Sequence, residues 1–393
     1  MLERNNAVII DYVSSTMDEQ DFEEMFRNCS TMPGQQAQKY NRLMIQGLSE
    51  NGAEVKVVSA RPIPVQNCFS KYIPTKRTIH GTVKYLYLPI LNIKPFKAFW
   101  QLISSFFLIL FDKCDAVILD VLNASVSYGA VTAACLKKKP CIGIVTDLPE
   151  LMVTGTGKSY SKLVWNTLNK CSGYVLLTKA MNYRVNPEGK PYVIIEALCD
   201  SRIKPVDTNE GHTNKVKKCM YAGLLDERYG VKNLVDGFII ASIEDVELHI
   251  YGDGPYAEEL KKLVIEHQNV IYHGTVLINE VVEAELDADL LINPRPTHEE
   301  FTKYSFPSKN MEYMASATPV LTTDLPGMPE DYKEYVYLIK DENAQGIAKA
   351  LKDVMSIDME SRIRKGQRAR QFVLNHKNNV IQSRKVMEMI RNI

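Results

Sequence analysis

Two charged side chains three residues apart, Lys309 and Glu312, have the spacing of neighbours on one face of a helix. They lie in segment 306–316, whose helical period follows an apolar run at 290–293. A lysine in the first turn of a helix can bind an anion together with the free backbone N–H groups there. Glu312 can then accept hydrogen bonds from hydroxyl groups beside that anion. The alternative for Glu312 is an ordinary exposed helix glutamate.

The residues before Lys309 are typical of a helix start. Ser305 is the expected N-cap, and Pro307 falls in the first turn, where its missing N–H costs nothing. Ser308 belongs to the same turn. Segment 305–309 therefore predicts an anion site at the beginning of a helix.

Two glycine-containing loops follow other apolar runs. Gly223 opens the loop 223–230, and Gly252 and Gly254 follow the run 246–251. Glycines allow a backbone to approach a ligand closely, although a tight turn is the equally simple alternative. Arg228 in the first loop is a candidate phosphate ligand or a solvated arginine.

The elements that must position these residues follow from alternating short apolar runs and longer segments of helical period. This alternation predicts parallel sheets with helical crossovers. The expected helices of the first half are 36–50, 96–113, 125–137 and 159–170. The expected strands are 7–10, 54–59, 116–120, 141–146 and 173–177, and then 218–222, 247–251, 270–272, 289–293, 319–322 and 336–339.

A length of 393 residues exceeds what one hydrophobic core usually serves. The polar stretch 199–218 separates the two sets of strands. We therefore expect an α/β protein with domains at 1–199 and 218–358, a linker at 200–217, and C-terminal helices at 359–393 that can cross back to the first domain.

Composition excludes several classes of protein. The 47 basic residues balance 47 acidic ones, so a nucleic-acid partner is not expected. The eight cysteines are scattered and fit reduced thiols, and the N-terminus lacks the pattern of a signal peptide. These features predict a cytoplasmic protein.

The most apolar segment, 96–111, carries Trp100 and several phenylalanines between lysines. Its uncharged stretch, 98–111, is too short to span a membrane. It fits either a core-facing crossover helix or a peripheral contact with the inner face of a membrane.

Taken together, several motifs resemble glycosyltransferase family 4. They are 221–223, 251–255, 293–294, 306–315 and 318–320. The resemblance implies the GT-B fold, in which two Rossmann-like domains face each other across a cleft. It also implies a retaining, metal-independent transfer of a sugar from a nucleotide-sugar, with no bound cofactor.

The resemblance also assigns roles to residues. Lys309 would stabilise the departing diphosphate and Glu312 would hold the ribose, as expected where negative charge develops. Segment 33–36 resembles the family's acceptor-side loop. The implied residues are Lys309, Asp147 and Arg228 for catalysis; Gly223, Gly252, Gly254, Tyr304, Ser305, Ser308, Lys309 and Glu312 for the donor; and Gly34, Gln35 and Gln36 for the acceptor.

The chain departs from the family pattern at three places. Tyr304 stands eight residues before Glu312, where relatives have a first glutamate; Glu299 or Glu300 is the candidate substitute. Leu224 and Tyr229 replace the basic residues of the first glycine loop.

The third departure concerns Asp147, which follows Thr146 where many relatives have a His-Asp pair. Its role is contact with sugar or acceptor, or capping of a helix.

The predicted function is transfer of a sugar from a UDP- or GDP-sugar to a saccharide or lipid-linked acceptor, in surface polysaccharide or glycan assembly. A nucleotide-sugar epimerase of the same fold and a nucleotide-sugar-binding protein without activity are the alternatives.

Asp287 and Asp289 match a metal-binding Asp-x-Asp pattern, but their place before a strand favours a cap or turn.

Overall fold

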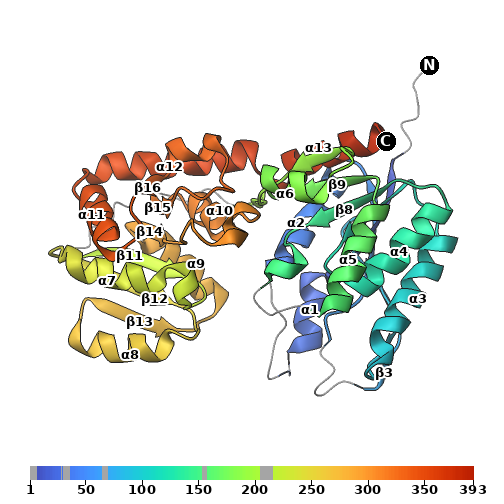
Figure 1. Cartoon of the computed structure of the whole chain (residues 1–393), viewed down its shortest axis with the longest axis horizontal. Coiled ribbons are helices and arrows are strands. Elements are labelled where there is room, and N and C mark those ends of the chain that lie inside the picture. Colours follow the sequence, from blue (N-terminus) through green and yellow to red (C-terminus); the bar gives the residue numbers. More distant parts are fainter. Residues whose placement is uncertain (1–6, 28, 30–35, 64–69, 153–156, 204–215) are drawn as a thin grey trace. The chain divides into compact units, whose positions relative to one another are not determined.

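The computed structural model describes residues 7–27, 29, 36–63, 70–152, 157–203 and 216–393 (Figure 1). The chain forms two compact units. Unit 1 comprises Met1–Leu198 and Asn379–Ile393, and unit 2 comprises Cys199–Asn378. The end of the chain thus belongs to the unit that contains its beginning.

Unit 1 is built on an eight-stranded sheet with the order β10-β9-β8-β7-β1-β2-β5-β4. Its strands are parallel except β4, which pairs antiparallel with β5. The short strands β3 (Tyr72–Ile73) and β6 (Ile90–Leu91) form a separate pair. The sheet strands are β1 (Ile9–Ser14), β2 (Glu54–Ser59), β4 (Lys76–His80), β5 (Val83–Tyr87), β7 (Ala116–Asp120), β8 (Cys141–Val145), β9 (Gly173–Leu176) and β10 (Tyr192–Ile194).

Helices cover this sheet because its central strands are apolar on both faces. Helices α1, α2 and α13 supply core residues that pack with alternate residues of β1 and β2. Helices α3, α4 and α5 lie side by side (Figure 1), with α4 against β1, β7 and β8. The helices are α1 (Glu19–Phe26), α2 (Gln36–Glu50), α3 (Phe96–Phe111), α4 (Ala124–Leu136), α5 (Lys158–Lys170), α6 (Lys179–Val185) and α13 (Asn379–Arg391), with a 3-10 turn η1 (Pro149–Leu151).

Helix α13 is fastened to α2 of unit 1. The Asn51 side chain, just after α2, donates hydrogen bonds to Val380 O at 2.8 Å and to Ser383 Oγ at 3.0 Å. Because α12 ends at His376 within unit 2, the chain passes between the units at residues 378–379.

Unit 2 has a six-stranded, all-parallel sheet with the order β13-β12-β11-β14-β15-β16. Helices α7, α8 and α11 share one core with the sheet, and α10 packs on α12. Its strands are β11 (Lys217–Ala222), β12 (Val246–Tyr251), β13 (Val270–Gly274), β14 (Leu290–Asn293), β15 (Val320–Thr323) and β16 (Tyr337–Ile339). Its helices are α7 (Val231–Ala241), α8 (Ala257–Glu266), α9 (Ile278–Asp287), α10 (Ser308–Ala315), α11 (Ala344–Met355) and α12 (Met359–His376), with 3-10 turns η2 (Glu227–Tyr229), η3 (Glu300–Lys303) and η4 (Glu330–Tyr335).

The predicted α/β class is confirmed, and several of the differences involve polar residues within strands. Strand β1 extends to Ser14, whereas the predicted strand ended at residue 10. The prediction stopped there because Asp11, which is buried in the structure, interrupts the apolar run. Strands β4 and β5 were not predicted, since β4 is mostly polar and exposed Lys84 interrupts the apolar run of β5.

Asp11 makes the stability of unit 1 depend on pH. Burial, together with the nearby Asp112 carboxylate, raises the pKa of Asp11 from 3.8 to about 7. A carboxyl group with a raised folded pKa stabilises the fold fully below its unfolded pKa, and this contribution disappears as the pH rises through the folded value.

We expect wild-type protein to lose roughly 3 to 4 kcal/mol between pH 4 and pH 8 through Asp11, at about 1.4 kcal/mol per pKa unit. Asp11→Asn should flatten this dependence, as measured by urea unfolding at pH 4 and pH 8. The exposed Asp115→Asn serves as control. Equal pH dependence in wild type and Asp11→Asn would contradict the assignment.

Candidate functional site

The strand order of unit 2 reverses between β11 and β14, so the segments that follow these strands meet at a topological switch point. Gly230 lies where the two segments touch. Its φ is 79°, and a Cβ there would lie 2.1 Å from Pro294 O. Only glycine fits both the backbone angle and the contact.

The two glycine loops are joined through their backbones. Gly223 N donates to Tyr251 O at 3.0 Å, and Leu225 N donates to Asp253 O at 2.9 Å. A Cβ on Gly252, whose φ is 125°, would lie 1.9 Å from Gly223 O. Gly252 and Gly254 are thus explained by loop contacts, and they hold the Gly223 loop at the carboxyl edge of the sheet.

Helix α10 is anchored to three strand ends by buried hydrogen bonds. The Tyr313 hydroxyl accepts from Ala222 N at 3.0 Å and donates to Ala222 O at 3.3 Å. Asn310 accepts from Asn293 at 2.7 Å and donates to Thr322 Oγ1 at 3.3 Å. Burial raises the pKa of Tyr313 well above its usual value, so its hydroxyl keeps its proton.

The start of α10 differs from the prediction. The helix begins at Ser308 with Pro307 at the N-cap position, so Ser305 is not the N-cap. Pro307 has an extended ψ of 115°, and the residue before a proline is also disfavoured in helices, which moves the start two residues later. Ser305 Oγ is buried, and none of the described groups forms a hydrogen bond with it.

The structure brings Lys309 and Glu312 together, as their spacing predicts. Lys309 Nζ lies 3.2 Å from Glu312 Oε2 and 3.8 Å from Glu285 Oε1. Glu285, on α9, is buried, whereas Lys309 and Glu312 are each about a quarter exposed. Two carboxylates and one ammonium carry a net negative charge, so a diphosphate beside them requires further cations.

Two arginines are close by at the switch point. Arg295, two residues after the end of β14, has its guanidinium 4.8 Å from the ring centroid of Tyr229 and 5.6 Å from that of Phe301. Arg228 lies 5.6 Å from the Phe301 ring and 3.4 Å from Glu299. Sequence reasoning found Arg228 but missed Arg295, although its position two residues after a predicted strand was the available signal.

Glu299 and Glu300 are the candidate replacements for the glutamate that the family pattern has at position 304. Two carboxylates hold their segment in place. Glu299 pairs with Arg228, and Glu342 accepts hydrogen bonds from Thr297 N at 2.9 and 3.1 Å. Glu300 begins η3, and Tyr304 follows its end as the C-cap residue. Glu342, which follows β16, is a carboxylate near this segment that sequence reasoning did not select.

Other predicted residues lie elsewhere. Asp287 and Asp289 bind Lys218 at the amino edge of the unit 2 sheet, through its ammonium at 2.5 Å and its N–H at 2.8 Å. Asp147 is an exposed residue of unit 1, two positions after β8. Gly34 and Gln35 fall outside the described residues, as does the side chain of Gln36.

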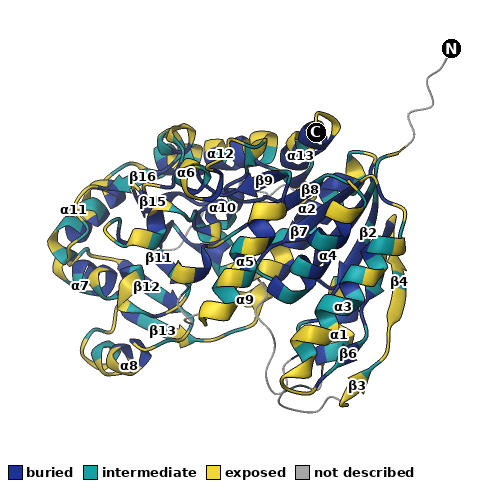
Figure 2. Ribbon diagram, turned by 45° about the vertical axis from the view of Figure 1, so that its right-hand side comes forward, coloured by how far each residue is buried: buried dark blue, intermediate teal, exposed yellow. Residues whose placement is uncertain are grey.

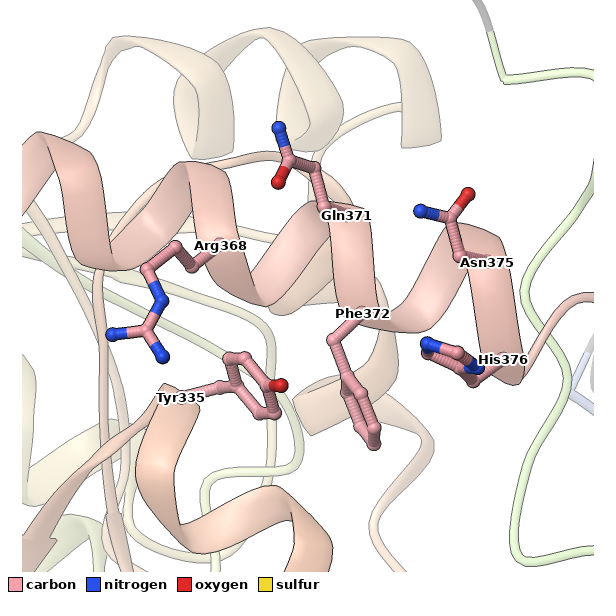
Figure 3. A pocket seen from close by; sticks show the side chains of 6 residues that line it. All are labelled: Tyr335, Arg368, Gln371, Phe372, Asn375 and His376. Carbon is pink, nitrogen blue, oxygen red and sulfur yellow. The ribbon is translucent and has the colours of Figure 1, made fainter.

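A surface cavity of about 200 Å³ lies on α12, apart from the predicted site residues (Figure 3). Within it the rings of Tyr335 and Phe372 stack with centroids 4.4 Å apart. Its lining residues are Tyr335, Arg368, Gln371, Phe372, Asn375 and His376.

Residues 216–356 match the model of the protein family described as Glycosyl transferases group 1. This match covers most of unit 2, including the switch point and α10. A search of curated protein sequences finds no match to the chain.

Solved structures match the whole chain at low sequence identity. Sucrose-phosphate synthase from Thermosynechococcus elongatus is 14% identical, with 98% of each chain covered and a TM-score of 0.67. HepE from Anabaena, in complex with UDP-glucose, is 13% identical, with 98% of this chain and 100% of HepE covered and a TM-score of 0.64.

A third similar structure is alpha,alpha-trehalose 6-phosphate synthase from Burkholderia multivorans. It is 10% identical, with 98% of this chain and 97% of the synthase covered and a TM-score of 0.64. The chain therefore has the GT-B fold, with one Rossmann-like region in each unit.

Tyr313→Phe tests the anchoring of α10. It removes the hydroxyl that pairs with Ala222 and leaves a buried N–H without its partner, which costs about 1 to 3 kcal/mol. We expect that loss in the free energy of unfolding by urea. Tyr183→Phe, at a side chain that is 83% exposed, should change little. Equal stability of Tyr313→Phe and wild type would show that the bond does not fasten the helix.

Proposed function

We propose that this protein is a retaining glycosyltransferase of the family 4 type. It transfers a sugar from a UDP- or GDP-sugar to the hydroxyl group of a saccharide or lipid-linked acceptor, in the assembly of surface polysaccharide or other glycans. The observation that carries the proposal is the anchored helix α10. Its first turn, Lys309 and Glu312 are fixed beside the glycine loop that follows β11.

The donor site follows from the charges at the switch point. The free N–H groups of the first turn of α10 and Lys309 offer donors to a diphosphate. Arg295 and Arg228 supply the positive charge that Leu224 and Tyr229 lack. Stacking on Tyr229 fixes the direction of the Arg295 guanidinium, as a preorganised anion site requires.

Glu312 is proposed to accept hydrogen bonds from the ribose hydroxyls. It lies one helical turn after Lys309, so a nucleotide whose diphosphate meets the first turn brings its ribose toward the next one. When the diphosphate draws the Lys309 ammonium away, the Glu312 carboxylate is released to accept from those hydroxyls.

In the transfer, the bond between the anomeric carbon and the diphosphate oxygen breaks, and the bonding electrons leave with the diphosphate. The acceptor oxygen forms its new bond on the same face of the sugar, and its proton passes to the departing oxygen. Donors aimed at this oxygen lower the barrier because negative charge grows there. No bound metal is needed for this step.

Unit 1 is proposed to bind the acceptor, with Asp147 and the loop at Gly34, Gln35 and Gln36 as contacts. The seven described cysteines are free thiols, which supports a reducing, cytoplasmic site of action.

Stabilisation by one nucleoside diphosphate in the presence of EDTA is the first expected result. A thermal-shift screen against UDP, GDP, ADP and their sugar conjugates, followed by an assay for slow sugar release from each hit, measures it. Lys309→Ala should lower kcat/KM for that donor about a hundredfold or more. Failure of all nucleotides to bind would reject the donor site, and binding without turnover would favour a nucleotide-sugar-binding protein.

Comparing the nucleotide with inorganic pyrophosphate separates the roles of the site residues. Lys309→Ala and Arg295→Ala should weaken both ligands about tenfold or more, because each removes a contact to the diphosphate. Glu312→Gln should weaken the nucleotide alone, since pyrophosphate has no ribose. Calorimetric titration measures each affinity.

The control for this comparison is Lys349→Ala, which removes an exposed lysine of α11 that pairs with Asp353. It should bind both ligands like wild type. Equal losses for nucleotide and pyrophosphate in Glu312→Gln would assign Glu312 to the positioning of Lys309 instead of the ribose.

A further inference from the structure

Helix α3 of unit 1 has an apolar face that the described structure leaves uncovered. Five aromatic side chains along it are between 37% and 78% exposed. Phe107 and Phe111, at its C-terminal end, stack on each other with centroids 6.3 Å apart. Figure 2 shows exposed residues along this helix. The exposed aromatic residues are Phe96, Phe99, Trp100, Phe107 and Phe111.

The opposite face of α3 already has its partner. Ser105 Oγ donates to Val126 O of α4 at 2.8 Å, and Ile109 is fully buried. A Cβ on Gly129 of α4 would lie 2.2 Å from Leu102 O, so the two helices touch through their backbones. Small residues of α4 pack against this inner face. The outer aromatic side chains are therefore not needed for packing within unit 1.

The charges around the outer face are positive. Residues 98–111 contain no charged side chain, and exposed Lys94 and Lys113 stand just beyond the two ends of α3. Asp112, between them, is neutralised by Lys56 at 3.0 Å. The pair β3–β6, which leads into the helix, adds exposed Lys71.

We propose that this face of α3 docks in the interfacial region of an anionic phospholipid bilayer. Aromatic side chains favour that region, and lysines at both ends favour negatively charged headgroups. Sixteen residues give a length of about 24 Å, short of the roughly 30 Å of a bilayer core, so the helix lies in the plane of the membrane. Among the described residues, no helix is long and apolar enough to cross a bilayer.

A second copy of the chain fits this face less well. A stable dimer normally buries about 800 Å² on each partner, supplied by some 20 to 30 residues. The outer face of α3 offers only a single helical stripe. Because Lys94 and Lys113 mark both ends, two such helices would place lysines against each other in either orientation. The proposal concerns unit 1 alone and does not depend on the donor site of unit 2.

The chain has two tryptophans, so Trp165→Phe leaves Trp100 as the only one and makes it a reporter on this face. The full-length Trp165→Phe protein is mixed with vesicles of phosphatidylcholine alone, or with 30% phosphatidylglycerol. We expect a blue shift of Trp100 emission and co-sedimentation with the anionic vesicles, and several-fold weaker binding to the neutral ones.

Variants in the Trp165→Phe background identify the contact. Phe99→Ser, Phe107→Ser and Phe111→Ser together should lower the partition coefficient about a hundredfold, since each removes a large apolar side chain from the interface. Lys94→Glu with Lys113→Glu should lower it at least tenfold. Unchanged thermal unfolding shows that the fold is retained.

The matched control is Ile265→Ser with Leu277→Ser, two residues of unit 2 that are 75% and 72% exposed. It should bind vesicles like its parent. Absence of vesicle binding, or binding that the phenylalanine variant retains, would overturn the proposal. If sedimentation velocity shows that the protein self-associates, and the phenylalanine variant abolishes this, a second copy of the chain covers the face and the membrane proposal is overturned.

Discussion

The hydrogen bonds between the Tyr313 hydroxyl and the backbone of Ala222 are the constraint on which the candidate site depends. They join the middle of α10 to the end of β11, although the two residues are far apart in sequence. The Asn310 side chain adds the ends of β14 and β15 to the same anchor. With three strand ends fixed to one short helix, the first turn of α10 has little freedom. A site that must present N–H groups and a lysine to one diphosphate needs this rigidity, because loosely held donors stabilise a developing charge less effectively.

The positive charge at the switch point does not come from Lys309 alone. Lys309 is shared between Glu285 and Glu312, so it alone leaves the surroundings negative. The Arg295 guanidinium, two residues after the end of β14, lies 4.8 Å from the centroid of the Tyr229 ring. Arg228, in the segment after β11, and Arg295, in the segment after β14, thus place positive charge on both sides of the switch point. Tyr229 carries no charge itself, but its ring contacts an arginine that does.

The fold was predictable because buried parallel strands carry unbroken apolar runs, and the sequence alternates such runs with helical periods. Elements without that pattern were missed. The prediction ended β1 at residue 10 because Asp11 interrupts its apolar run. It missed the edge of the unit 1 sheet because β4 is mostly polar and Lys84 interrupts β5. In the site, the spacing of Lys309 and Glu312 predicted that they share one face of a helix, and in the structure Lys309 Nζ lies 3.2 Å from Glu312 Oε2. Arg295 was missed because its candidate role depends on contacts with the rings of Tyr229 and Phe301, which are distant from one another in sequence and come together only in the fold.

Helix α3 shows why sequence alone left two interpretations open. A segment that is apolar all round indicates either burial or contact with lipid, and periodicity does not separate the two. The decisive residue lies in another element: Gly129 of α4 lets the helices approach so closely that Ser105 and Ile109 suffice for the inner face. The crossover and the membrane-contact interpretations therefore describe opposite faces of one helix. If the acceptor is lipid-linked, docking of unit 1 on a bilayer would restrict the encounter of enzyme and acceptor to the membrane surface. Docking would not raise the encounter rate with a water-soluble acceptor.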